Sequence, residues 1–280
     1  MLTQAEIIAN TKRLDGRCPI HGLPMMQLNI PVKIAGEDEP RKPSPVCPKC
    51  AKEQRDKKEE ELVKESLKNN LYLRTYDVLM RDSTIPEELR SASFDNFVVK
   101  TTQEKQMLDF AKAQTQKYLN GFEGNTLLTG TTGVGKTHLT VAMAKSLNET
   151  YKDKGNPKSV LFVNLTEILR KVRESFKYES KESYYSRMLM EADYLFLDDL
   201  GVKLGNSGQS KSAWEEEFIF DVLSHRKSTI VTTNLSNNEI ANLYSERVAS
   251  RVRTGLEGNV FRAVDIEDKR YKINQLTAKG

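Results

Sequence analysis

The chain has 280 residues, a length that suits a small module joined to a larger domain. Its formal net charge of +4 arises from many charges of both signs, which permits a nucleic-acid partner without requiring one. No apolar run is long enough to cross a bilayer, and the first residues lack the basic-then-apolar order of a secretory signal. We therefore expect a cytoplasmic protein without a membrane partner.

The three cysteines of the chain all lie in its first fifth. Cys18 and His21 form a C-x2-H pair, and Cys47 and Cys50 form a C-x2-C pair. Zinc prefers four such ligands in a tetrahedron, and an odd number of cysteines argues against a disulfide framework. We predict that these residues bind a structural zinc ion, because four protein ligands leave no open position for a substrate. The alternative is a set of idle thiols beside a chance histidine.

The rest of the amino-terminal part has no catalytic motif. Residues 23–46 are proline-rich, and we expect an irregular loop that the metal holds folded. Residues 51–80 combine dense mixed charge with good helix formers, which is typical of an exposed helix. Residues 76–92 contain serine and proline and are predicted to form a linker. The predicted domains are residues 1–75, with the zinc site, and residues 93–280.

The strongest motif is G-x-x-x-x-G-K-T, which lies between a short apolar strand and a helix with apolar periodicity. Its glycines let backbone N–H groups turn toward phosphate oxygens, and the following helix points its positive end at the same charge. Lys136 is placed to reach the β- and γ-phosphates, and Thr137 offers a hydroxyl to Mg²⁺. The predicted ATP-binding residues are Gly130, Thr131, Thr132, Gly133, Val134, Gly135, Lys136, Thr137 and His138. For His138, an ordinary position on the helix is the stronger alternative.

A second acidic element follows in the sequence ADYLFLDDLG, residues 192–201. Its apolar run is typical of a buried parallel strand, and its two carboxylates stand at the carboxyl end, where α/β sheets bind ligands. We predict that Asp198 holds Mg²⁺ together with Thr137 and that Asp199 polarises the attacking water. Many related ATPases have glutamate at this second position, so the shorter aspartate favours slow hydrolysis. The alternative is an acidic strand end without a role.

Two further elements complete the pattern. The β-rich run KSTIVTTNLS contains Asn234, a polar residue where the sheet edge would meet the γ-phosphate. Ser236 and Glu239 then form a capping box that begins a helix. In the next segment, YSERVASRVRTG, Arg247 and Arg251 lie one helical turn apart on one face. Such an arginine is placed to reach a neighbour's γ-phosphate, although two surface arginines are the commoner explanation of this spacing.

The helix predicted at residues 165–178 has an apolar stripe and cations beside it. Single-strand DNA binders combine such cations with stacking aromatic rings. The candidate DNA-binding residues are Arg170, Lys171, Arg173 and Phe176, with core packing as the alternative role of Phe176. A Gly/Ser-rich loop at 203–213 has two interpretations, a flexible insertion or a lid over a DNA channel.

Strands and helices alternate through this part of the chain, which predicts an α/β fold: a parallel sheet with helices on both faces. The motifs ASFDNF, LLTGTTGVGKTHL, LFLDDLG, IVTTNLS and SERVASRV resemble those of the AAA+ P-loop ATPases. More narrowly, the chain resembles the bacterial and phage replicative helicase loaders of the DnaC/DnaI type. The CPIHG and CPKC module resembles the amino-terminal zinc domain of the DnaI-like branch. This resemblance implies an AAA+ domain with a reduced or absent helical lid, preceded by a small zinc-binding domain.

The resemblance also implies a function. The protein would be an ATPase that loads the hexameric replicative DNA helicase onto single-stranded DNA during replication initiation, with ATP, Mg²⁺ and Zn²⁺ as cofactors. Asn234 falls at the sensor-1 position that aligns the lytic water, Arg251 at the arginine finger, and Arg270 at the sensor-2 position of the nucleotide site. The zinc domain would grip the helicase. The ATPase domains would self-associate in a ring or spiral and contact single-stranded DNA.

Two other functions remain open. A transposase-helper ATPase would share the AAA+ core and would bind duplex DNA and a transposase, but the zinc module argues against it. A scaffold could bind ATP as a switch with little hydrolysis. The intact set of Lys136, Asp198, Asp199 and Asn234 argues against that second function.

Overall fold

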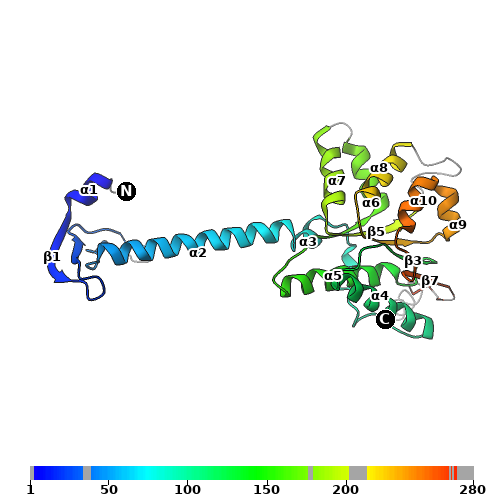
Figure 1. The fold of residues 1–280 in the computed structure, drawn as a ribbon, viewed down its shortest axis with the longest axis horizontal. Coiled ribbons are helices and arrows are strands. Elements are labelled where there is room, and N and C mark those ends of the chain that lie inside the picture. The colour runs from blue at the N-terminus through cyan, green and yellow to red at the C-terminus, as the bar shows by residue number, and fades with distance from the viewer. Residues whose placement is uncertain are drawn as a thin grey trace, which may run out of the picture. The chain divides into compact units, whose positions relative to one another are not determined.

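The computed structural model describes residues 3–33, 39–175, 179–201, 213–264, 266 and 268–269. By its internal contacts the chain divides into two compact units, Met1–Asn70 and Leu71–Gly280 (Figure 1). Helix α2, Pro48–Arg74, belongs partly to each unit and buries none of its residues, as expected for an exposed helix. Among the described residues, no helix combines the length and apolar character needed to cross a membrane.

The first unit contains a capped helix, α1 (Gln4–Ala9), and an antiparallel pair, β1 (Thr11–Arg17) and β2 (Pro24–Leu28). Strand β2 lies inside residues 23–46, where we expected an irregular loop. Further bridges join Met26 to Val46 and Val32 to Arg41. The expectation of an irregular loop is wrong for these residues, because their backbone groups pair with β1 and with one another.

The second unit is built on a five-stranded sheet in the order β4-β5-β6-β3-β7. The strands are β3 (Thr126–Gly130), β4 (Val160–Asn164), β5 (Tyr194–Leu200), β6 (Thr229–Thr233) and β7 (Val260–Ala263). Every neighbouring pair is parallel, which confirms the predicted parallel sheet. Strand β7 was not predicted. This order places the carboxyl ends of β5, β6 and β3 side by side.

Helices cover both faces of the sheet. They are α3 (Val78–Asp82), α4 (Thr102–Leu119), α5 (Lys136–Asp153), α6 (Leu165–Ser175), α7 (Glu179–Glu191), α8 (Ala213–Ser224), α9 (Asn237–Leu243) and α10 (Glu246–Arg253), with a 3-10 turn, η1 (Glu87–Leu89). Successive residues of a strand face opposite sides of the sheet and so belong to two different hydrophobic cores. In β5, Leu195 and Leu197 pack with α6 to α10, and Phe196 packs with α4 and α5. Figure 1 shows these two helical layers on opposite sides of the sheet.

Residues 76–92 are part of the second unit and not a linker. Val78 and Leu79, in α3, are buried in the two cores of the sheet. The amide of Thr84 donates to the carbonyl of Phe162 in β4 at 2.8 Å. The linker prediction is wrong here because Ser83 and Thr84 run beside β4 and hydrogen-bond to its backbone groups.

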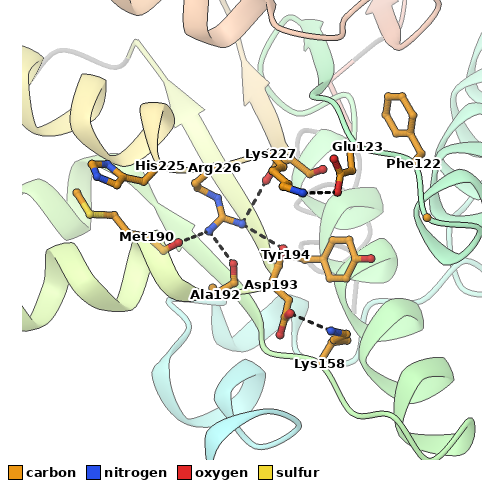
Figure 2. Close-up of a pocket in the computed structure, with 12 residues that line it drawn as sticks. Phe122, Glu123, Lys158, Met190, Ala192, Asp193, Tyr194, His225, Arg226 and Lys227 are labelled. Carbon is orange, nitrogen blue, oxygen red and sulfur yellow. Dashed lines mark hydrogen bonds and ion pairs between the residues drawn. The ribbon is translucent and has the colours of Figure 1, made fainter.

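Arg226 closes the C-terminal end of α7 at the edge where the strands begin (Figure 2). Its guanidinium donates to the carbonyls of Leu189, Met190, Ala192, Asp193 and Ser228 at 2.7 to 3.3 Å. Desolvation by burial lowers the pKa of Arg226 to about 10. A cavity of about 380 Å³ lies beside it, at the opposite edge of the sheet from the P-loop, so this cavity is not the nucleotide site.

Arg226→Met should lower the free energy of unfolding by about 2–3 kcal/mol, because five carbonyls, three of them in buried residues, lose a charged donor. Urea denaturation followed by circular dichroism measures this change. The matched control is Arg187→Met, whose ion pair with Glu191 spans 3.9 Å between two exposed side chains. That variant should change stability by less than about 0.5 kcal/mol. Equal losses in the two variants would contradict the bonding role of Arg226.

Candidate functional site

Lys136 bridges the phosphate loop and strand β6. It is the first residue of α5 and is only 5% exposed. Its Nζ donates to the backbone carbonyls of Gly130 and Thr131 at 2.8 and 2.9 Å. It also donates to Asn234 Oδ1, directly after β6, at 2.7 Å. The fold therefore brings together Lys136 and Asn234, which lie far apart in the chain and were both predicted from the sequence to act on ATP.

Two glycines allow other segments to approach the loop closely. Gly133 and Gly135 have φ angles of 80° and 100°, which favour glycine. A Cβ on Gly133 would collide with the carboxylate of Asp268, and one on Gly135 would lie 2.7 Å from the ring of Phe97. The amide of Lys269 also donates to Gly133 O at 3.0 Å. These neighbours were not predicted from the sequence, although Phe97 belongs to the motif ASFDNF.

His138 contacts Ser93 and Phe97. Its Nε2 lies 3.0 Å from the carbonyl of Ser93, and its ring meets Phe97 edge-on at 5.3 Å between centroids. Thr131 and Thr132 are exposed at the tip of the loop, whereas Val134 is fully buried beneath it. A direct contact of His138 with nucleotide stays a prediction.

Asp198 is held by hydroxyls from two elements. Thr137 Oγ1, in α5, donates to its Oδ1 at 3.1 Å, and Thr232 Oγ1, in β6, donates to the same oxygen at 2.6 Å. Only 4% of Asp198 is exposed, and this burial raises its pKa to about 6, with the charge of Asp199 adding to the effect. A hydroxyl beside a carboxylate is the oxygen donor set that Mg²⁺ prefers, and a cation there would favour the charged carboxylate.

Asp199 sits on a distorted part of β5. The pairing of β5 with β6 slips between Leu197 and Leu200, and Asp199 has a φ angle of 59°. Bulges of this kind re-aim side chains next to active sites, and strained residues gather there. The amide of Asp199 donates to Thr232 Oγ1 at 3.0 Å, and Asn164 Nδ2 donates to its Oδ2 at 3.4 Å.

Thr232 and Asn164 also contact the two aspartates of the candidate site and were not predicted from the sequence. Thr232 contacts both aspartates, so it fixes their relative orientation. Asn164 ends β4 as Asn234 follows β6, and the two segments read VLFVN and IVTTN. An asparagine at the carboxyl end of a parallel strand was therefore an available signal, used for Asn234 alone.

Four side chains of the first unit form a compact metal-ligand cluster. The ligand atoms of Cys18, His21, Cys47 and Cys50 all lie within 4.8 Å of one another. Cys18 Sγ is 3.7 Å from Cys50 Sγ, and His21 Nδ1 is 3.2 Å from Cys50 Sγ and 3.7 Å from Cys47 Sγ. A tetrahedral zinc ion with bonds of about 2.0–2.3 Å separates its ligands by roughly 3.5–3.8 Å. The cluster is compatible with such an ion.

Glu53 supports the cluster from α2, one turn after Cys50. Its Oε1 lies 3.3 Å from Nε2 of His21, the ring nitrogen that faces away from the cysteines. Carboxylates commonly fix the orientation of a metal-binding histidine in this way. The backbone N–H of His21 also donates toward Cys18 and is the main cause of a lowered thiol pKa of about 6. The lowered pKa of Cys18 favours the thiolate that a metal requires, whereas desolvation by burial raises the pKa of the Cys50 thiol to about 11.

Arg251 is not brought to the P-loop of its own chain. Asn125 Nδ2, directly before β3, donates to the carbonyls of Arg251 and Val252 at 2.8 and 3.1 Å. The P-loop begins at the other end of β3, after Gly130. Five strand residues span ~16 Å. The helix end that carries Arg251 and the phosphate loop therefore lie at opposite edges of the sheet.

The predicted DNA-binding cations are already paired. Arg170 contacts Glu174 at 3.0 Å, and Lys171 contacts Glu167 at 2.7 Å. Arg173 pairs with the buried Glu215 and lies over the ring of Trp214. DNA contact by these residues stays a prediction and requires those ion pairs to open. Phe176, Arg270 and residues 203–212 of the predicted loop lie outside the described residues.

Relatives in sequence are named for helicase loading. The replicative helicase loader DnaC of Escherichia coli K12 is 29% identical over 174 residues, which cover 59% of this chain and 64% of that protein. The replicative helicase loader DnaC of Buchnera aphidicola (Schizaphis graminum) is 27% identical over 195 residues, covering 68% and 74%. The chain thus spans a little under two thirds of the E. coli relative.

A solved structure shows the same fold. Domain III of the Thermotoga maritima replication initiation protein DnaA superimposes with a TM-score of 0.52 at 17% identity, covering 70% of this chain and 76% of that chain.

The family model described as IstB-like ATP binding protein matches residues 53–252. That match includes the P-loop, both aspartates, Asn234 and Arg251. The chain therefore belongs to the family of IstB-like ATP binding proteins, with an AAA+ P-loop fold.

Proposed function

We propose that this chain is an ATPase that loads a hexameric replicative helicase onto single-stranded DNA during replication initiation. One observation carries the ATP chemistry: Lys136 joins Asn234, and Thr137 joins Asp198, at one edge of the sheet. The loading role is supported by the relatives that are named replicative helicase loaders.

The chemistry follows from the positions of these groups. Lys136 and the amides of the loop bind the β- and γ-phosphates. Thr137 and Asp198 would hold Mg²⁺, which would neutralise phosphate charge. Asp199 accepts a proton from the attacking water or orients it, while Asn234 aligns that water. The register shift that carries Asp199 places this carboxylate at the carboxyl end of β5, beside Asp198.

A second chain completes the site. Arg251 lies at the edge of the sheet opposite its own P-loop, because Asn125 binds its carbonyl at the start of β3. It is exposed, so a neighbouring subunit can receive it. In the assembled ring or spiral, Arg251 neutralises charge that develops on the neighbour's γ-phosphate. ATP hydrolysis therefore requires self-association.

The zinc-binding unit grips the helicase. In the structural zinc role all four ligands come from the protein, so the ion stabilises the fold and does not meet substrate. Apolar side chains including Ile7, Ile8 and Ile20 are exposed in this unit and are available to a protein partner. The ATPase domains, in turn, contact single-stranded DNA.

Freshly purified protein should contain about one zinc ion per chain by atomic emission spectroscopy. Cys47→Ser should remove the zinc and the capture of a hexameric replicative helicase in a pull-down, because the first unit loses its structural ion. ATP binding by the same variant should stay within about twofold of the wild type. Glu53→Gln should weaken zinc affinity by about 10- to 100-fold without removing a ligand. Absence of zinc from the purified protein would contradict the zinc assignment. Capture of the helicase by Cys47→Ser would contradict helicase binding by the first unit.

Asp199→Asn should bind ATP as the wild type does and lose ~100-fold or more in kcat, because it removes a general base and spares the Mg²⁺ ligands. Lys136→Ala should instead weaken ATP binding by at least about tenfold. Nucleotide titration and steady-state phosphate release separate the two effects. Asp109→Asn, at an exposed pair with Lys105, is the surface control and should change neither quantity. Normal turnover by Asp199→Asn would show that another group activates water.

Arg251→Ala should bind ATP normally and fail to hydrolyse it. Mixing this variant with Lys136→Ala should restore part of the phosphate release, because one chain supplies the nucleotide site and the other supplies the arginine. The mixture is measured with single-stranded DNA and helicase present. If co-assembled mixtures show no restored turnover, Arg251 does not act between subunits.

A further inference from the structure

Phe220 of α8 contacts the guanidinium groups of both arginines on the exposed face of α10. The Cζ atom of Arg247 lies 4.0 Å from the centre of the Phe220 ring, and that of Arg251 lies 5.7 Å from it. The ring is partly buried against the core that contains α8 and α10, so its own position is fixed by packing. Both distances fall within the range of cation–π attraction.

These two arginines differ from Arg173 and Arg253 of the same unit. Arg173 pairs with Glu215, and Arg253 pairs with Glu246 at 3.3 Å. Within the part of the chain that the structure describes, neither Arg247 nor Arg251 forms an ion pair with a carboxylate. Their contact with Phe220 leaves the charge available to an anion, because an aromatic ring does not neutralise it.

The backbone beneath the two arginines is held at both ends of α10. The amide of Ser245 donates to Glu216 of α8 at 2.6 Å, and Asn125 closes the last turn. Val248 and Val252 are buried on the face of α10 that packs against the core. With the backbone fixed, the remaining freedom lies in two long side chains of like charge, one turn apart, which repel each other. The ring of Phe220 offsets that repulsion and restricts the rotamers of both.

We propose that Phe220 is a positioning residue that holds Arg251, together with Arg247, in the orientation in which it meets the ATP of a neighbouring subunit. The inference rests on the proposed action of Arg251 between subunits. Phe220 acts through Arg251 and does not itself touch nucleotide. Its effect therefore belongs to the chain that donates the arginine and not to the chain that binds the ATP.

The test uses full-length chains in a two-chain mixture. The Arg251→Ala chain supplies an intact nucleotide site, and the Lys136→Ala chain supplies an intact arginine. Phe220→Leu is added to one chain at a time, because leucine keeps the apolar packing and removes the ring. In the arginine donor it should lower kcat about two- to fivefold, the change that one exposed cation–π contact supports, with KM for ATP unchanged. In the other chain it should cause no further loss, and Phe220→Tyr in the donor should restore the full rate.

Each other outcome overturns the inference in a distinguishable way. Equal rates with and without Phe220→Leu in the donor would show that the ring does not position the arginine. Equal losses from Phe220→Leu in either chain, or no restoration by tyrosine, would assign Phe220 to folding alone. No turnover in the mixture that has Phe220 unchanged would refute the transfer of Arg251 between subunits, and the positioning role with it.

Discussion

The buried carboxylate of Asp198 ties together the elements that make the nucleotide site. It accepts a hydrogen bond from Thr137 at the start of α5 and another from Thr232 in β6. The hydroxyl of Thr232 also accepts a hydrogen bond from the amide of Asp199, so one side chain contacts both aspartates. Because β6 lies between β5 and β3, the strand order is what lets these groups meet at one edge.

The same sheet separates the parts of the proposed ATPase chemistry. Its carboxyl edge carries the P-loop and the aspartates, whereas the opposite edge carries the end of α10, fixed by Asn125. A strand of five residues is too long for an arginine at one end to reach phosphate at the other through the core. We propose as a consequence that each chain carries an incomplete site, which Arg251 of a neighbouring chain completes. Phe220 orients that arginine.

The sequence predicted the parts of the site that stand in motifs. Lys136 and Thr137 follow from the glycine spacing, and Asp198 and Asn234 follow from polar residues at the ends of apolar strands. Thr232 and Phe220 could not be found in this way, because a threonine in a strand and a phenylalanine in an apolar stripe look like ordinary residues. Their roles depend on which strand or helix lies beside them. For the same reason the edge pairing of residues 76–92 resembled a linker, and Glu53 was one acid among many in a charged helix.

The central claim, a nucleotide site shared between chains, is tested most directly by measuring ATP turnover per chain against protein concentration. The account predicts a rate per chain that rises steeply as monomers associate, in parallel with the assembled fraction measured by sedimentation. Single-stranded DNA should move this rise to lower concentration, because it gathers chains on one strand. A rate per chain that is the same for isolated monomers and for assemblies would contradict the account, since every catalytic group would then belong to one chain.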